Sequence, residues 1–504
     1  MRSGKRMISE ILKLDKLEHF DDIIEMNNGI PHFKILVGGR WVMANAYIDV
    51  RSPINNEIIA RVSKMDVQMA DESLDKAVSA KRAMKDLPGF SRIEILEKAA
   101  TLLDERKESV INALILNVGK TRKDAIGEVD STLDRIKNVK SDARTILGDF
   151  VPGEWSKHNK GRIAIVVREP VGVVLAISPF NYPLFISYTK VIPALVAGNA
   201  VLLKPSSAVP LAPLLMAKIL DDAGLPKGAL STIIAPGIIA SYLSTSNFVD
   251  MITFTGSTET GLELTKISGV KKIHLELGGK ASAIVLPPIG NLKKVAKDIV
   301  DGSLKLSGQR CDAINRVLVH KDLAPKLISE ITEIVKNMKI GNPFEEGVSS
   351  GPLIDRKAVE RVSALVKDAV QKGAKICTGG KSRENYYEPT VLCNVPLESK
   401  IMWEETFGPV IPIYTFQNEE EAVEITNRSE YGLDNSVFTD DINIAWRVAN
   451  KIESGEVTVN GFPSHGIGFF PFGGVKQSGL GREGIGYSVE EFTNTKTIVY
   501  NLEE

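Results

Sequence analysis

The sequence predicts an α/β protein built around a doubly wound, Rossmann-like sheet. A continuous apolar run, VGVVLAI at 171–177, suits a strand that is buried on both faces. A helical stretch follows at 184–197 and ends at Gly198-Asn199, residue types that favour a helix terminus. Strand-like and helix-like segments continue to alternate along the middle of the chain, which indicates a parallel sheet.

The first unit is expected to continue this pattern to residue 286. We expect further strands at 200–203, 231–234, 251–254, 272–275 and 281–286, and a second helix at 211–223 that ends at Gly224. Ligands bind at the carboxyl ends of parallel strands, so the loops after these strands are the candidate binding loops. Before the sheet, apolar residues recur at helical spacing in the segment 70–120, which predicts amphipathic helices.

A second unit is expected at about 290–475, again with alternating elements. Helices are predicted at 292–306, 324–338 and 356–372, and strands at 316–320, 410–415, 436–439 and 456–460. The segment 471–474 is expected to be a loop. Residues 1–35 are charged and irregular, which suggests a loosely attached arm, and the weakly alternating tail at 495–501 predicts an edge strand.

Composition and charge exclude several classes of protein. Of the 504 residues, 43% are hydrophobic and 25% are charged, which is typical of a globular chain with more than one core. Lys and Arg total 62 against 63 Asp and Glu, so the net charge of -1 provides no basic surface for nucleic acid. No apolar run approaches the roughly 20 residues of a membrane helix, and the N-terminus lacks an apolar signal core. We expect a cytoplasmic protein with neither a nucleic-acid nor a membrane partner.

Of the three cysteines, one is a candidate nucleophile. Three cysteines cannot form a disulfide framework, no CxxC pair suggests a metal site, and the count fits a reducing compartment. Cys377 and Cys393 lie in apolar or strand-like segments and are expected to be small buried hydrophobic residues. Cys311 instead follows Ser-Gly-Gln-Arg at 307–310 and precedes Asp312. A neighbouring cation and a helix start would favour its thiolate.

Glu276 is a candidate general base. In the segment IHLELGGK at 273–280, period-2 alternation puts His274 and Glu276 on one face of a strand. Gly278-Gly279 lets the backbone turn sharply and approach a ligand closely. A carboxylate at a strand end that faces a cleft suits proton abstraction, whereas His274 is interpreted as structural.

Two loops after expected strands supply further polar groups. In SPFNYP at 178–183, two prolines hold Asn181 at the mouth of the strand, where its amide would donate to a developing oxyanion. In FTGST at 254–258, small residues precede a helix, which suits a pyrophosphate at the helix N-terminus. The GxGxxG of the usual dinucleotide fingerprint is absent from the sequence, so that loop is not expected.

Together these segments resemble the aldehyde dehydrogenase superfamily. Seven motifs occur in the family's order over about residues 35–500: SPFNYP at 178–183, KPS at 204–206, FTGST at 254–258, ELGGK at 276–280, GQRC at 308–311, EETFGPV at 404–410 and PFGGVKQSGLGREG at 471–484. The resemblance implies the aldehyde dehydrogenase fold, which combines a Rossmann-like cofactor domain, an α/β catalytic domain and a small β oligomerisation element. The implied cofactor domain comprises 1–159 and 172–288, and the catalytic domain 289–483. The oligomerisation element comprises 160–171 and 484–504. It also implies a homo-oligomer, expected to be a tetramer, that the C-terminal strand helps to build.

The resemblance also assigns roles to individual residues. It implies that Cys311 is the nucleophile, Glu276 the base and Asn181 the oxyanion donor. The residues implied to bind the dinucleotide are Ser178, Pro179, Phe180, Lys204, Ser207, Gly237, Gly256, Ser257, Leu277, Glu405 and Phe407. Of these, Lys204 and Glu405 would bind the riboses, Ser257 the pyrophosphate and Phe407 the nicotinamide side. No metal is implied.

Three segments narrow the resemblance. FNYP at 180–183, GQRCDAI at 308–314 and HGIGFFPF at 465–472 look like those of archaeal non-phosphorylating glyceraldehyde-3-phosphate dehydrogenases. That similarity implies a glycolytic oxidation of glyceraldehyde 3-phosphate to 3-phosphoglycerate by NADP or NAD, through a cysteine thioester. The candidate substrate-binding residues are Tyr182, Arg310 and His465. For Arg310, a fork-like grip on phosphate and simple packing into the scaffold are equal alternatives.

Ser207 departs from the family pattern, because many members carry Glu directly after KPS. A carboxylate there would accept hydrogen bonds from the adenosine ribose and would repel a 2′-phosphate. Ser207 removes that repulsion and offers a hydroxyl donor, and the nearby cation of Lys204 suits a 2′-phosphate. These differences predict that NADP is preferred and NAD tolerated.

Three other functions stay open. A succinate-semialdehyde dehydrogenase or another broad-range aldehyde dehydrogenase is the nearest alternative on substrate. A coenzyme-A-acylating relative, which releases its thioester to a thiol, is disfavoured by Glu276. A catalytically silent relative is disfavoured by the intact set of Cys311, Glu276 and Asn181.

Overall fold

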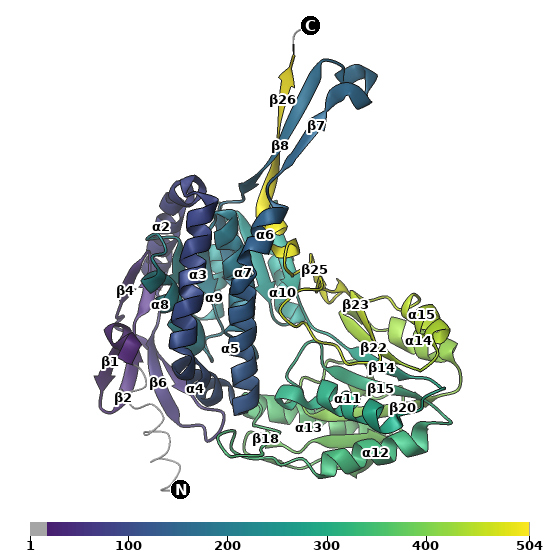
Figure 1. The fold of residues 1–504 in the computed structure, drawn as a ribbon. Coiled ribbons are helices and arrows are strands. Elements are labelled where there is room, and N and C mark those ends of the chain that lie inside the picture. Colours follow the sequence, from purple (N-terminus) through teal and green to yellow (C-terminus); the bar gives the residue numbers. More distant parts are fainter. Residues whose placement is uncertain (1–17, 503–504) are drawn as a thin grey trace.

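A six-stranded sheet forms the centre of the first unit in the computed structural model, which describes residues 18–502 (Figure 1). In spatial order its strands are β11 (Leu230–Thr232), β10 (Ala200–Lys204), β9 (Val173–Ile177), β12 (Met251–Thr255), β13 (Lys272–Glu276) and β25 (Gly479–Leu480). All neighbours from β11 to β13 are parallel, and every residue of β9, β10 and β12 is buried. The apolar runs therefore form strands covered on both faces, as predicted.

Two of the crossover helices end where the sequence predicts. The helix α7 (Phe185–Ala197) stops at Gly198 and α8 (Leu211–Ala223) stops at Gly224. These glycines have φ angles of 92° and 100°, a left-handed conformation that a residue without a Cβ adopts readily. The backbone N–H of each glycine donates to a carbonyl of the last helical turn, so both predicted ends are confirmed.

The direction of chain progression reverses between β9 and β12. From β9 the chain moves outward to β10 and β11, and it then returns to build β12 and β13 on the other side of β9. A crevice forms at the carboxyl ends of parallel strands where such a reversal occurs. The loops after β9 and β12 therefore border the position at which a ligand is expected.

A seven-stranded sheet forms the second unit. In order its strands are β16 (Lys375–Thr378), β19 (Thr390–Cys393), β20 (Val410–Phe416), β15 (Ile314–His320), β14 (Ala281–Val285), β22 (Asp434–Phe438) and β23 (Glu456–Val459). Its helices are α11 (Leu292–Leu304), α12 (Ala324–Lys336), α13 (Arg356–Gln371), α14 (Glu419–Asn427) and α15 (Ile442–Ala449). The helices and strands predicted for 292–460 are confirmed.

The prediction that 281–286 extends the first sheet is wrong. The strand β14 pairs in parallel with β15 and β22 in the second sheet. The chain changes sheets between Glu276 and Ala281, within the ELGGK motif. Both sheets contain buried parallel strands, so apolar patterning alone cannot show to which sheet a strand belongs.

A three-stranded arm projects from the two units and carries the C-terminal end of the described chain (Figure 1). Its strands are β26 (Thr493–Asn501), β8 (Arg162–Pro170) and β7 (Asp149–Pro152), in that order. The strand β26 pairs antiparallel with β8 along its whole length. The predicted edge strand at 495–501 is therefore confirmed.

The N-terminal part of the described chain packs into the first unit. The 3-10 helix η2 (Glu18–Ile23) precedes a four-stranded sheet, β1 (Ile24–Asn27), β2 (Ile30–Phe33), β6 (Ile58–Ser63) and β5 (Tyr47–Arg51). Phe20 and Ile23 are fully buried, so the expectation of a loose arm is wrong for this part. The rest of that expectation, at 1–17, lies outside the described residues.

The helices predicted at 70–120 are also present, as α2 (Val67–Asp86), α3 (Gly89–Glu105) and α4 (Lys107–Val118). The chain continues through α5 (Arg122–Lys137) and α6 (Val139–Thr145), and the hairpin β3 (Ile35–Val37) and β4 (Arg40–Val42) precedes them. Within residues 18–502, no helix has the length and apolar character needed to span a membrane.

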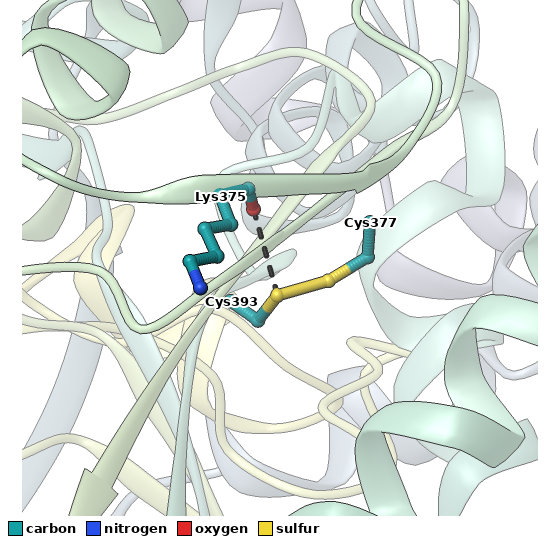
Figure 2. The surroundings of a disulfide bond; sticks show 3 residues. All are labelled: Lys375, Cys377 and Cys393. Atoms are coloured by element: carbon teal, nitrogen blue, oxygen red, sulfur yellow. Dashed lines mark hydrogen bonds between the residues drawn. A yellow bond between two sulfur atoms is a disulfide. The ribbon is translucent and has the colours of Figure 1, made fainter.

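Cys377 on β16 and Cys393 on β19 are joined by a disulfide bond (Figure 2). The two strands pair antiparallel at the edge of the second sheet, and the two Cα atoms are 6.5 Å apart. Both residues are half-buried. The prediction of two small buried hydrophobic residues is therefore wrong, because sequence alternation cannot show that two short strands bring these positions together.

Candidate active site

A cavity of about 600 Å³ lies between the strand ends of the first unit and the segment that precedes β15. Six residues singled out in the sequence line it: Asn181, Tyr182, Glu276, Arg310, Cys311 and His465. They come from four segments that are far apart in the sequence, and the fold brings these segments together.

Cys311 follows a tightly constrained loop. The 3-10 helix η5 (Lys305–Gly308) leads into it, and Gly308 has a φ of 72°. A Cβ at Gly308 would lie 2.2 Å from the carbonyl oxygen of Gly408, which leaves room for glycine only. This contact fixes the backbone that presents the Cys311 thiol to the cavity.

The surroundings of Cys311 favour the neutral thiol in the absence of ligands. Burial raises the pKa of Cys311 well above its usual value, and the carboxylates of Asp312 and Glu405 act in the same direction. The prediction that a neighbouring cation favours the thiolate is wrong for this arrangement, because the charge of Arg310 is already engaged by Asp312. A base is therefore needed to take the thiol proton.

Arg310 is packed into the scaffold, one of the two alternatives that its sequence context leaves open. Its Nε and Nη2 donate to the two carboxylate oxygens of Asp312 at 3.0 and 2.7 Å, and Nη2 also donates to the carbonyl oxygen of Pro463. The side chain is buried and part of the scaffold, yet it lines the cavity and its Nη1 is buried without a hydrogen-bond partner.

Glu276 ends β13 and faces the cavity from a buried position. A Cβ at Gly473 would lie 2.9 Å from its Oε1, so that glycine makes room for the carboxylate. Burial raises the pKa of Glu276 to about 7, while the charge of the nearby His274 acts in the opposite direction. A carboxylate that titrates near neutrality is well matched to proton abstraction.

Behind Glu276 lies a group of charged side chains that sequence reasoning did not connect with it. His274 Nε2 is 3.4 Å from Glu276 Oε1, and His274 Nδ1 is 2.5 Å from Glu491 Oε2. Lys190 pairs with Glu483 at 2.6 Å, although 293 residues separate them. The period-2 spacing of His274 and Glu276 indicates that these two residues lie on the same face. Nothing in the sequence indicates the pairing of Lys190 with Glu483.

Asn181 lies in the loop between β9 and α7. Its Nδ2 donates to the carbonyl oxygen of Gln309 at 2.9 Å, which ties it to the Cys311 loop. A primary amide has two N–H groups, so one remains for another acceptor. Its side chain is buried at the cavity wall, where such an acceptor would stand.

Tyr182 and His465 also line the cavity. The ring of Tyr182 stacks on the ammonium group of Lys120, 3.4 Å from the ring centroid, and that ammonium pairs with Glu128 at 2.7 Å. Burial raises the pKa of Tyr182, so its hydroxyl remains a hydrogen-bond donor at neutral pH. His465 packs against Phe472, with their ring centroids 4.3 Å apart.

The residues implied to bind the dinucleotide follow the carboxyl ends of neighbouring strands. Ser178, Pro179 and Phe180 follow β9. Lys204 ends β10, and Ser207 follows it. Gly237 begins α9 (Gly237–Thr245) after β11, Gly256 and Ser257 follow β12, and Leu277 follows β13. Ser257 caps α10 (Thr258–Ile267) by accepting from the N–H of Thr260. The helix N-terminus therefore faces the same edge as the other loops.

A cationic and a polar side chain at the end of β10 and just after it, Lys204 and Ser207, have unusual surroundings. Lys204 is buried, its Nζ has no carboxylate partner among the described residues, and burial lowers its pKa. The Ser207 hydroxyl donates to the carbonyl oxygen of Ala235 at 2.8 Å. Its single proton is thus already used, which corrects the expectation that Ser207 offers a free donor.

The second unit contributes the remaining implied residues. The N–H of Gly279 donates to Glu405 Oε1 at 3.1 Å. Phe407 has a φ of 45°, and its ring meets that of Phe180 edge-on, with centroids 5.7 Å apart. Loops from both units therefore meet beside the cavity.

Comparison with known proteins identifies the family. The family model described as "Aldehyde dehydrogenase family" matches residues 41–498. An NADP-dependent glyceraldehyde-3-phosphate dehydrogenase of Streptococcus equinus is 39% identical over 472 residues, covering 93% of this chain and 99% of that protein. A mitochondrial succinate-semialdehyde dehydrogenase of Arabidopsis thaliana is 38% identical over 482 residues, covering 94% and 90%.

Solved structures agree with the sequence comparison. The structure of an NADP-dependent glyceraldehyde-3-phosphate dehydrogenase from Bacillus halodurans, complexed with NADP, superposes with a TM-score of 0.91 at 37% identity. The match covers 93% of this chain and 99% of that one. The parallel sheets, the ordered motifs and these matches agree, and the chain belongs to the aldehyde dehydrogenase family.

Proposed function

We propose that the protein oxidises glyceraldehyde 3-phosphate to 3-phosphoglycerate with NADP, through a thioester on Cys311 and without incorporating inorganic phosphate. The observation that carries the proposal is one cavity lined by Cys311, Glu276 and Asn181, with Arg310 also among its lining residues. A nucleophile, a base, an amide donor and a nearby guanidinium are what this reaction requires.

The first half of the reaction builds the thioester. The Cys311 thiol releases its proton to water, and its sulfur bonds to the aldehyde carbon. The aldehyde oxygen becomes an oxyanion, which the free N–H of Asn181 and the backbone N–H of Cys311 stabilise. The bound dinucleotide supplies the hydride acceptor, and when the carbon–hydrogen bond breaks with its electron pair, the acyl group remains on sulfur.

The second half releases the acid. Glu276, in its ionised form, abstracts a proton from a water molecule, and the water oxygen bonds to the thioester carbon. The carbon–sulfur bond then breaks, and the sulfur leaves as thiolate. Because water and not phosphate attacks, the product is a free carboxylate.

The residues at the strand ends fit a dinucleotide. Lys204 is a buried cation without a carboxylate partner, and Thr255 Oγ1 at the end of β12 is buried without a hydrogen bond. Lys204 ends β10 and Thr255 ends β12, the two strands that flank β9. We assign Lys204 and Glu405 to the riboses, the start of α10 at Ser257 to the pyrophosphate, and Phe407 to the nicotinamide side.

A phosphorylated substrate is supported by the charges on the substrate side of the cavity. Arg310, Lys123 and Lys305 line it, and neither lysine forms an ion pair among the described residues. Guanidinium and ammonium groups suit a phosphate. We assign Tyr182 and His465 as lesser substrate contacts. A smaller carboxylate would also satisfy Arg310, which keeps succinate semialdehyde as the second candidate.

The family fold also supports proposals on organisation. We propose a homotetramer in which the β7–β8–β26 arm contributes to the contacts, because Phe150, Trp155 and Tyr500 expose 64%, 91% and 47% of their surface there. We propose the domain ranges inferred from the sequence, with the boundary at 288 moved to the change of sheet between Glu276 and Ala281.

A panel of phosphorylated and unphosphorylated aldehydes, each with NADP and NAD, tests the function. We expect the highest kcat/KM for glyceraldehyde 3-phosphate, with 3-phosphoglycerate as product and no dependence on inorganic phosphate. A higher kcat/KM for succinate semialdehyde would replace the proposed substrate, and oxidation that requires phosphate or coenzyme A would refute the hydrolytic mechanism.

A further inference from the structure

We propose that His274 is a positioning residue for the general base: held between Glu276 and Glu491, its imidazolium keeps the Glu276 carboxylate ionised and oriented toward the cavity during thioester hydrolysis. The inference rests on the proposed role of Glu276 as the base. It adds a function to a histidine that the sequence alone presents as structural.

The imidazole ring of His274 lies between two carboxylates. His274 lies two residues before Glu276 on the same face of β13 and is 3% exposed. Its Nε2 is 3.4 Å from Glu276 Oε1 and its Nδ1 is 2.5 Å from Glu491 Oε2. The backbone at Gly481, with a φ of 97°, makes room for the ring, since a Cβ there would lie 2.4 Å from His274 Nδ1. The imidazole therefore bridges two carboxylates.

Glu491 is itself held in place and reaches solvent. It ends α16 (Tyr487–Glu491), and its Oε1 accepts from the backbone N–H of Arg482 at 2.8 Å. Its side chain is 29% exposed, whereas those of His274 and Glu276 are 4% and 3% exposed. A partly solvated carboxylate thus fixes the far side of the ring and stabilises its positive charge.

Burial and charge have opposite effects on this pair. Burial opposes a charged imidazole, but the charges of the nearby Glu276 and Glu491, and the hydrogen bond between the ring and Glu491, outweigh it and raise the pKa of His274 to about 10. For Glu276, burial favours the neutral acid, and the nearby His274 has the largest opposing effect on its pKa. Loss of the imidazolium would therefore raise the pKa of Glu276, so the base would remain protonated up to a higher pH.

The other charged groups near Glu276 do not replace His274. Those that act on it are Lys190 on α7, Glu483 in the loop after β25, and Cys311 and Asp434 from the second unit. Lys190 bonds Glu483 at 2.6 Å, so the two charges offset each other, and the remaining groups are acidic. Glu483 also contacts His274 Nε2 at 3.6 Å and His465 Nε2 at 3.6 Å, which spreads its charge over both rings. His274 is the cation within reach of Glu276 itself.

The test is the pH dependence of thioester hydrolysis in His274→Gln. Glutamine keeps a hydrogen-bonding side chain and removes the charge, so the pKa of Glu276 should rise and the rate should need a higher pH. We expect the inflection of the hydrolysis rate, measured after the first burst of reduced cofactor, to move up by about one unit. At pH values below the parent inflection, hydrolysis should be about tenfold slower, whereas the burst itself keeps its rate.

Two further variants secure the interpretation. Glu491→Gln leaves the ring in place and removes the charge that stabilises the imidazolium. We expect a smaller upward shift in the pH inflection of hydrolysis. This variant tests the proposal even if His274→Gln does not fold. Glu490→Gln, a neighbouring exposed position on α16, is the matched control and should leave the profile unchanged. A uniform slowing at every pH with the inflection unmoved, in either test variant, would show a structural role only. A parent enzyme without a burst would instead contradict the thioester mechanism.

Discussion

The Cα atom of Gly279 lies against the carbonyl oxygen of Cys311, so closely that a Cβ at residue 279 would be 2.2 Å from that oxygen. Cβ atoms do not come within 3.0 Å of such an atom without a shift of the backbone. The loop that follows Glu276 and the loop that carries the thiol are thus packed backbone to backbone. The relative position of the proposed base and the proposed nucleophile depends on the absence of a side chain at this residue.

Gly279→Ala should therefore reduce activity without unfolding the protein. The added methyl group would displace the Cys311 backbone, and a misplacement of about 1 Å can cost about 10²-fold in rate. We expect kcat to fall by roughly that factor, measured alongside thermal melting. Gly89→Ala is the matched control, because the nearest atom to its Cβ would be the flexible end of Arg92 at 3.7 Å. Full activity in Gly279→Ala would contradict the proposed dependence.

Cys311→Ser should abolish aldehyde oxidation and leave dinucleotide binding intact, because only the nucleophile is lost. Turnover is measured by the absorbance of reduced cofactor, and binding by titration calorimetry. Cys377→Ser and Cys393→Ser break the disulfide at the far edge of the second sheet and should keep the parent turnover at moderate temperature. Turnover near the parent rate in Cys311→Ser would refute its assignment.

The base and the oxyanion donor should slow different phases. In Glu276→Gln the acyl-enzyme should accumulate, with one burst of reduced cofactor and a steady state slower by about 10²–10⁴-fold. In Asn181→Ala the burst itself should be slower by roughly 10²–10³-fold, because the oxyanion forms before the hydride leaves. Stopped-flow measurement separates the phases. If both variants slow the same phase, the division of roles is incorrect.

Local features of the fold could be predicted from the sequence because local physics determines them. Gly198 and Gly224 end helices since each takes a left-handed conformation, and the run at 171–177 forms a strand since it is apolar on both faces. The sheet to which a strand belongs depends on distant pairing, so the place of 281–285 was not predictable in this way. The same holds for the disulfide between Cys377 and Cys393.

The candidate site shows the same division. The sequence placed Cys311, Glu276 and Asn181 among the residues that now line one cavity. It could not show that Asp312 engages the charge of Arg310, that Ser207 donates to Ala235, or that Lys190 pairs with Glu483 across 293 residues. Electrostatics at a buried site depends on such partners, and they become visible only when the chain is folded.

Arg310→Gln should separate phosphorylated from unphosphorylated substrates. The substitution removes a guanidinium group from the cavity lining, so KM for glyceraldehyde 3-phosphate should rise far more than KM for glyceraldehyde. It also leaves Asp312 buried without its cation, so thermal melting must accompany the kinetics. Lys305→Gln removes a cation from the same wall and leaves no carboxylate without a partner, and a smaller change in the same direction is expected. Equal effects on both substrates in both variants would mean that these cations only shape the scaffold.

Cofactor preference should depend on charge at position 207 and not on its hydroxyl. The Ser207 proton is donated to the carbonyl oxygen of Ala235, so Ser207→Ala should leave the ratio of kcat/KM for NADP and NAD nearly unchanged. Ser207→Glu introduces a carboxylate that repels a 2′-phosphate and accepts hydrogen bonds from a free ribose. The buried, unpaired Lys204 favours the 2′-phosphate in the parent enzyme, which should therefore prefer NADP. We expect Ser207→Glu to shift the ratio at least about tenfold toward NAD, equivalent to about 1.4 kcal/mol. A parent enzyme with the higher kcat/KM for NAD, or a Ser207→Ala variant that shifts as far as Ser207→Glu, would show that repulsion at this position does not set the preference.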